Sequence, residues 1–303
     1  MSLQFIVEGL VAGAVIGLGA IGVTLTYAIL RFADFAHGEF ISWGAYFTLV
    51  VSGLLGLVAG GTAAPLGPFS FTWPILGAGL VALLATGVLA LALDSVLFRR
   101  LRETGEGIVA VMASFGASLA LRSLIEAIFS SRPAYFTRAL QIAKPLGLGT
   151  RITPNQAATL AATAVLVVVT HLVLTRSRMG RSMRAVAENP SLARVNGIDV
   201  EGVIRATWLI GGALAAASGI VVGLLVQIRP SMGFDLLLPL FAAAILGGIG
   251  SVPGAVVGGL VVGLSEAAAV AFVGAQWRGA VAFVILIAVL LMRPSGLFGP
   301  SHR

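Results

Sequence analysis

Side chains that could carry out chemistry are few and far apart in this sequence. The three histidines are His37, His171 and His302. There is no HExxH motif, and the scattered acids lack metal-ligand spacing. No serine lies in a triad signature, and the single lysine, Lys144 in AKPLG, does not match the GxxxxGK[ST] pattern of a phosphate-binding loop. We therefore expect no catalytic residue, no metal site, no intramembrane hydrolase and no cofactor bound by this chain.

Acids inside apolar segments are the remaining candidates for chemistry, because they could couple transport to an ion gradient. Glu266 lies near the middle of an apolar segment, in GLSEAAAV, and Glu126 lies in another. Arg122 precedes Glu126 by four residues, so the two could pair on one helix face. Glu266 could equally face a wet cavity or bond to a neighbouring helix.

One strongly polar stretch, GRSMRAVAENPSLARVNGIDVEGV at Gly180–Val203, separates two long apolar segments. Asn189 suits an N-cap, Pro190 the first helical position and Gly197 the C′ position. The pattern predicts a helix over Pro190–Asn196, with Leu192 and Val195 on one face. Such a short helix is not stable alone in water, so it must pack on something.

The flanks of this helix also carry helical signals. Met179–Glu188 reads as a second amphipathic piece, and Asp199 could cap the helix that leads into the next apolar segment. A solvated hairpin that touches only its own protein is the alternative interpretation. The capping at both ends of the short helix favours contact with a partner.

The composition indicates what kind of secondary structure surrounds these residues. The chain is 58% hydrophobic and 10% charged, whereas soluble domains carry roughly 25% charged residues. We therefore expect an all-α polytopic membrane protein in a lipid bilayer. A span needs about 20 apolar residues. The predicted segments are Gly9–Leu30, Phe40–Gly60, Pro74–Leu93, Ile108–Phe129, Gln156–Leu174, Thr207–Ile228, Leu236–Val273 and Gly279–Met292.

Leu236–Val273 is too long for one span and is broken by GGIGSVPG at Gly247–Gly254. We interpret it as two segments, the first short and a candidate re-entrant one, which gives eight or nine segments in all. The first segment of the chain lacks a basic region before it and a cleavage site, so it reads as a span rather than a signal peptide. Gly9, Gly13 and Gly17 recur every four residues, as do Gly254 with Gly258 and Gly259 with Gly263. This spacing favours close helix packing in lipid, or helices that slide during transport.

Basic residues orient the chain. With Gly180–Val203 in the cytoplasm and nine segments, the cytoplasmic side holds 12 basic residues and the outer side 6, which predicts the N-terminus outside and the C-terminus inside. The net charge of +7 does not indicate nucleic acid, because basic residues are not interleaved with aromatics. The cytoplasmic set is Arg31, Arg99, Arg100, Arg102, Arg176, Arg178, Arg181, Arg184, Arg194, Arg205, Arg293 and Arg303; the outer set is Arg132, Arg138, Lys144, Arg151, Arg229 and Arg278.

Three blocks of sequence resemble the permeases of branched-chain amino-acid ABC transporters. RFADFAHGEFISWGAY at Arg31–Tyr46 resembles their (I/A)(N/D)FAHG segment, with Asp34 where the family often has Asn. Gly180–Val203 resembles their cytoplasmic coupling loop, and Phe241–Ala267 their near-C-terminal signature. The blocks lie in order across most of the chain, and the match is closer to the H-type (LivH-type) permease than to the longer M-type.

The resemblance implies a single permease domain over residues 1–303 in a bacterial inner membrane. It implies a coupling loop at 175–206, an outer loop at 130–155, two ATPase subunits that bind ATP and Mg²⁺, a second permease subunit and a periplasmic binding protein. Ser130–Asn155 could help to dock the binding protein or merely connect two spans. By position, the ATPase-coupling residues would be Glu188, Asn189, Pro190, Ser191, Leu192, Ala193, Arg194, Val195, Asn196 and Gly197.

Phe35, His37 and Gly38 lie at a membrane boundary and, with Glu266, are candidates for a helix break or the transport pathway. A pH-sensing role for His37 is less favoured than a hydrogen bond to a backbone carbonyl at a helix break, where Gly38 would allow a turn or close packing. An ion-coupled carrier or channel acting alone is the alternative function, and a structural scaffold is a third. Leucine, isoleucine and valine are the substrates that the resemblance implies, with other amino acids, urea, short amides and aromatic acids left open.

Overall fold

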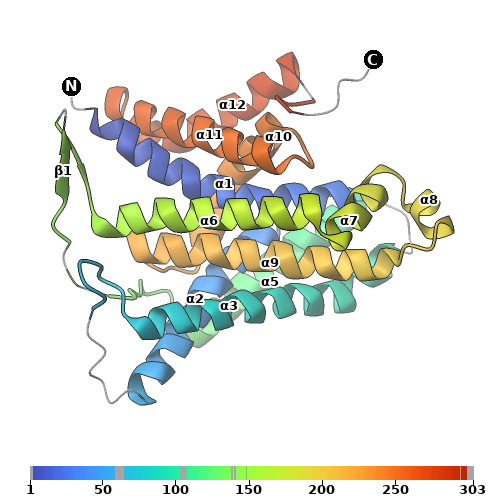
Figure 1. The fold of residues 1–303 in the computed structure, drawn as a ribbon, viewed down its shortest axis with the longest axis horizontal. Helices are drawn as coiled ribbons and strands as arrows, with labels where there is room; N and C mark the ends of the chain where they lie inside the picture. The colour runs from blue at the N-terminus through green and yellow to red at the C-terminus, as the bar shows by residue number, and fades with distance from the viewer. Residues whose placement is uncertain are drawn as a thin grey trace.

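The computed structural model is a bundle of long apolar helices with a short polar pair of helices at one end (Figure 1). It describes residues 3–58, 65–102, 107–137, 139, 141–147, 149–293 and 295–298. The helices are α1 (Gln4–Leu30), α2 (His37–Val58), α3 (Trp73–Leu93) with a π-helical continuation (Asp94–Phe98) and α4 (Arg99–Arg102), α5 (Gly107–Phe129), α6 (Pro154–Arg176), α7 (Arg178–Glu188), α8 (Pro190–Val195), α9 (Val200–Leu225), α10 (Met232–Gly247), α11 (Val252–Phe272), a 3₁₀ turn (Ala275–Trp277) and α12 (Arg278–Met292).

Within the described residues, eight helices are long and apolar enough to cross a membrane, and the sixteen-residue α10 is a shorter apolar one. Each predicted segment overlaps one of these helices, and Leu236–Val273 overlaps both α10 and α11, so the all-α membrane fold is confirmed. The largest shift is at α9, which begins at Val200 rather than Thr207 because the Asp199 side chain accepts a hydrogen bond from the Gly202 N–H and caps it. Gly60, Arg138, His302 and Arg303 lie outside the described residues.

The connection between α5 and α6 holds the two named strands among the described residues. Strands β1 (Lys144–Gly147) and β2 (Thr150–Ile152) form an antiparallel pair. The pair leads into α6 through a capping box, in which Thr153 and Gln156 satisfy each other's backbone N–H groups. Figure 1 shows β1 beside the N-terminus, at the end of the bundle opposite α8.

The break predicted at Gly247–Gly254 separates α10 from α11. The residues that follow α10 lie beside the last two turns of α1, where the Gly250 N–H donates to Thr24 Oγ1 at 2.6 Å. The Leu297 N–H also donates to the Leu246 carbonyl there, at 2.8 Å. The start of the first helix, α1, and the end of the last helix, α12, lie on opposite sides of the bundle (Figure 1).

The small residues of α1 and α11 bring the two backbones together. A Cβ built on Gly259 would lie 2.4 Å from the Gly17 Cα, and one on Gly13 would lie 2.7 Å from the Leu260 Cα. Real Cβ atoms cannot approach so closely, so only glycine fits at these positions. The prediction of close helix packing is confirmed at this seam.

Helix α2 starts inside the bundle rather than at its surface. The His37 ring packs on Gly22 of α1, where a Cβ would lie 2.6 Å from the ring. Gly22 precedes the end of α1 by eight residues, so α2 begins about 12 Å inside that end. Residues 31–36 run back into the bundle without helical structure, and Phe32, Asp34 and Ala36 are buried there.

Helix α10 starts inside the bundle as well, against the start of α2. A Cβ on Gly233 would lie 1.7 Å from the Gly38 carbonyl oxygen. The Gly233 N–H donates to Ser42 Oγ at 3.0 Å, and Ser42 Oγ donates to the Pro230 carbonyl at 3.1 Å. The two helix beginnings are thereby held together within the membrane-spanning part of the molecule.

Candidate functional site

The short polar helix predicted between two apolar segments is α8, at one end of the bundle (Figure 1). The Asn189 side chain accepts a hydrogen bond from the Leu192 N–H at 3.0 Å and caps its first turn. Pro190 takes the first helical position, where a missing N–H costs nothing. The helix predicted over Pro190–Asn196 is thus present over Pro190–Val195, with Asn196 as its C-cap.

The C-terminal end of α8 is closed by a left-handed residue. Gly197 has φ +80°, and the Ile198 N–H returns to the Ala193 carbonyl at 3.0 Å. The Asn196 side chain donates to the Leu192 carbonyl at 2.8 Å. These contacts satisfy carbonyls that a helix end would otherwise leave open.

Helix α8 presents apolar side chains to the outside. Ala193 is buried against the bundle, whereas Leu192 is 59% exposed and Val195 85% exposed. Two exposed aliphatic side chains on one face of a two-turn helix form a surface that a partner groove can bury. The polar residues Glu188, Ser191 and Arg194 in this segment are exposed as well.

Arg31 ties the base of this helix to the end of α1. Its Nη2 donates to the carbonyls of Ala187 and Glu188, both at 3.1 Å. These carbonyls end α7, immediately before the Asn189 cap. Arg31 itself caps α1 in a left-handed conformation, with φ +58°. The sequence predicts Arg31 only as one of the cytoplasmic basic residues, because an arginine-to-carbonyl contact over more than 150 residues has no sequence signature.

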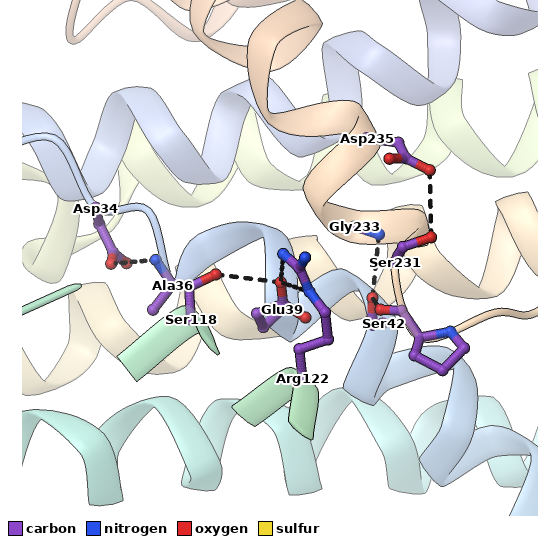
Figure 2. A network of polar contacts seen from close by, with 10 residues as sticks. Asp34, Ala36, Glu39, Ser42, Ser118, Arg122, Ser231, Gly233 and Asp235 are labelled. Atoms are coloured by element: carbon purple, nitrogen blue, oxygen red, sulfur yellow. Dashed lines mark hydrogen bonds and ion pairs between the residues drawn. The ribbon is translucent and has the colours of Figure 1, made fainter. Parts of the chain in front are cut away.

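A second polar site lies inside the bundle, where α2 and α5 meet (Figure 2). Glu39 Oε1 accepts from Arg122 Nη2 at 2.9 Å, Arg122 Nε at 3.3 Å and Ser118 Oγ at 3.2 Å. The Glu39 side chain is fully buried and that of Arg122 is 19% exposed. The Arg122 guanidinium also lies 4.2 Å from the centre of the Phe234 ring on α10.

The predicted pairing of Arg122 with Glu126 is corrected by this contact, since Arg122 pairs with Glu39 on another helix. Arg122 pairs with Glu39 because the Glu39 carboxylate is buried and would otherwise lack a counter-charge. Glu126 is exposed and has less need of one. Glu39 was not singled out from the sequence. The signal that could have found it is that a charge in an apolar span must pair with another one.

The FAHG residues occupy the buried start of α2. The His37 ring is buried, and neither ring nitrogen has a hydrogen-bond partner within the described residues. The expected hydrogen bond from His37 to a backbone carbonyl is therefore not observed. Gly38 allows close packing as expected, since a Cβ there would lie 2.7 Å from Leu237. The Phe35 ring packs between two other rings, with its centroid 5.9 Å from that of Phe115 and 5.6 Å from that of Phe241.

Glu266 bonds to a neighbouring helix, the second of the two interpretations that the sequence left open. Arg278 Nε at the start of α12 lies 2.9 Å from Glu266 Oε2, with the Glu266 side chain 3% exposed. Glu266 lies on α11, whereas Glu39 lies on α2. No group of three or more His, Cys, Asp or Glu side chains among the described residues is arranged to hold a metal ion.

Eight span-length apolar helices and the shorter α10 among the described residues, together with a capped polar helix at one end, define a multi-pass membrane transport permease. The chain belongs to the family described as "Branched-chain amino acid transport system / permease component", whose model matches residues 5–290. It is a permease subunit of an ABC-type import system in the bacterial inner membrane.

The relatives that match this chain cover nearly its whole length. The high-affinity branched-chain amino acid transport system permease protein LivH of Escherichia coli K12 is 32% identical over 98% of this chain and 95% of its own. BraD of Pseudomonas aeruginosa, a permease of the same description, is 33% identical over the same shares. The probable LivH of Methanocaldococcus jannaschii is 26% identical over 99% of this chain and 94% of its own. No solved structure matches the chain.

Proposed function

We propose that the chain forms half of the membrane path of an ATP-driven importer of branched-chain amino acids. Its relatives over nearly full length carry that substrate class in their names. A second permease subunit completes the path, and a periplasmic binding protein delivers the substrate. Two ATPase subunits bind ATP and Mg²⁺ and perform the hydrolysis, so this chain catalyses no reaction itself.

The observation that carries the proposal is α8. A six-residue helix is too short to persist on its own propensity, yet it is capped at both ends and exposes Leu192 and Val195. An ATPase groove supplies the burial that these side chains lack. Glu188–Gly197 is then the coupling element, and its contact must be stronger in one state of the cycle for ATP to shift the equilibrium.

Force from the ATPases reaches the bundle by two routes. One is covalent, through the Asp199 cap into α9. The other is the Arg31 bridge from the end of α7 to the α1 end and the buried connection 31–36. Displacement of α8 therefore moves α9 and α1 together, and the start of α2 follows α1.

An ion-coupled carrier that acts alone is the competing function. Glu266, its principal candidate, is neutralised by Arg278, which disfavours a free proton-carrying site. Reconstitution separates the two functions. We expect leucine uptake only in proteoliposomes that hold this chain, a second permease, the ATPases, the binding protein and internal ATP. Gradient-driven uptake by this chain alone would contradict the proposal.

A further inference from the structure

The Glu39–Arg122 ion pair is incomplete. Both contacts from Arg122, and that from Ser118, end on Glu39 Oε1. Oε2 is buried and has no hydrogen-bond partner among the described residues. Arginine–carboxylate pairs frequently use both carboxylate oxygens, in two parallel hydrogen bonds. This arrangement leaves one carboxylate oxygen free to accept, and Arg122 Nη1 free of any described hydrogen bond to Glu39.

The position of the pair sets it apart from a surface salt bridge. Glu39 lies in the first turn of α2, which starts inside the bundle, and Arg122 lies within the spanning helix α5 (Figure 2). Ionisable side chains at this depth are rare in membrane proteins and mark functional positions, among them the pathways of substrates and ions. Helices that begin at mid-membrane are a common way of building such sites, because their N-terminal N–H groups stabilise anionic groups.

Aromatic rings flank the pair. Phe115, Ser118 and Arg122 share one face of α5 at spacings of three and four residues. Phe115 is 42% exposed and packs on Phe35, while Phe234 is 37% exposed and lies under Arg122. A partly open apolar surface thus adjoins a donor and an acceptor of opposite charge.

Resting on the proposed function, we propose that Glu39 and Arg122 bind the zwitterionic backbone of an amino acid during its passage. The substrate ammonium donates to Glu39 Oε2 and the substrate carboxylate accepts from Arg122. The aliphatic side chain lies against Phe35 and Phe115. A zwitterion suits this pair because it inserts between the two charges without leaving either one uncompensated in a low-dielectric surrounding.

The test uses the complete transporter in proteoliposomes and measures leucine uptake and ATP hydrolysis together. In Glu39→Gln/Arg122→Gln both charges are lost, so no unpaired charge remains to prevent folding. We expect leucine transported per ATP to fall about tenfold or more, the loss that charge-assisted contacts produce, while ATP hydrolysis stimulated by the liganded binding protein persists. Arg229→Gln/Asp235→Asn removes a half-exposed ion pair and is expected to leave leucine transport per ATP unchanged.

Arg122→Lys keeps the charge but loses the two-donor fork, and serves if the double variant does not assemble. We expect it to lower leucine transport per ATP as well. Unchanged leucine transport per ATP in an assembled variant would overturn this site and leave the importer function standing. Absence of ATP-dependent leucine uptake by the unaltered complex would instead overturn the proposed function, and the site with it.

Discussion

The Arg31 guanidinium donates a 3.1 Å hydrogen bond to the backbone carbonyl of Glu188, the last residue before the cap of α8. It makes an equal contact with Ala187. The residue at the turn into the buried connection 31–36 is thus fastened to the base of the projecting helix. This pair of contacts gives the coupling proposal a specific mechanical link.

Arg31→Ala should weaken coupling. Hydrogen bonds from a charged donor contribute roughly 1.5–3 kcal/mol, and solvent reduces this for an exposed pair to about 1 kcal/mol, or about fivefold. We expect binding-protein-stimulated ATP hydrolysis to fall by that factor in the reconstituted complex, with basal hydrolysis retained. Arg31→Gly is the matched variant, because glycine tolerates φ +58°. Equal losses in both variants assign the effect to the guanidinium, whereas full activity of Arg31→Gly would assign it to backbone strain.

Leu192→Asp should abolish stimulated ATP hydrolysis while the chain still inserts into the membrane. The side chain is 59% exposed in the isolated chain, so the change does not disturb the bundle. In the complex, an acid would be buried in an apolar groove without a partner, at a cost of several kcal/mol. Leu192→Met, which keeps apolar volume, should retain stimulation. Normal stimulation in Leu192→Asp would count against the coupling role of α8.

Asn189→Ala should loosen α8 locally. Loss of an N-cap costs about 1 kcal/mol, so amide hydrogen exchange across Pro190–Val195 should speed up about fivefold. Asn189→Asp keeps the oxygen that accepts from the Leu192 N–H and should preserve protection. Exchange that is equally slow in both variants would show that the cap does not hold this helix.

Gly259→Ala should destabilise the α1–α11 seam, because its Cβ would meet the Gly17 backbone at 2.4 Å. Overpacking of this kind costs about 1–3 kcal/mol and should lower the melting temperature of the purified chain in detergent. Gly53→Ala on α2, where a Cβ meets nothing within 4 Å, is the matched control. It should be neutral or stabilise by up to about 1 kcal/mol. A similar melting temperature for both variants would mean that the seam has room to relax.

The parts of this fold that could be predicted from the sequence are those set by local rules. Hydropathy gave the spans, and Asn189, Pro190 and Gly197 gave both ends of α8, because capping depends on a few adjacent residues. The Asp199 cap was anticipated for the same reason. The glycine spacing that predicted tight packing is likewise visible within one turn of helix.

The parts that could not be predicted depend on which helices meet. The sequence offers Glu126, four residues away, as a partner for Arg122. Only the placement of α2 against α5 shows that Arg122 pairs with Glu39 instead. The start of α2 inside the bundle follows from the fit of His37 on Gly22. A hydropathy pattern does not show how far inside the bundle a helix begins, because predicted helix boundaries are uncertain by several residues.

The glycine seam has a consequence for how the molecule can move. With backbone on backbone at Gly17 and Gly259, α1 and α11 cannot roll past each other and must travel as one block. A displacement of the last turn of α1 through Arg31 therefore also displaces α11, more than 200 residues downstream. Any movement of this block relative to the other helices must therefore change the backbone conformation where the block ends. Gly274, which connects α11 to the turn before α12 and has φ +131°, is a position where such a change can occur.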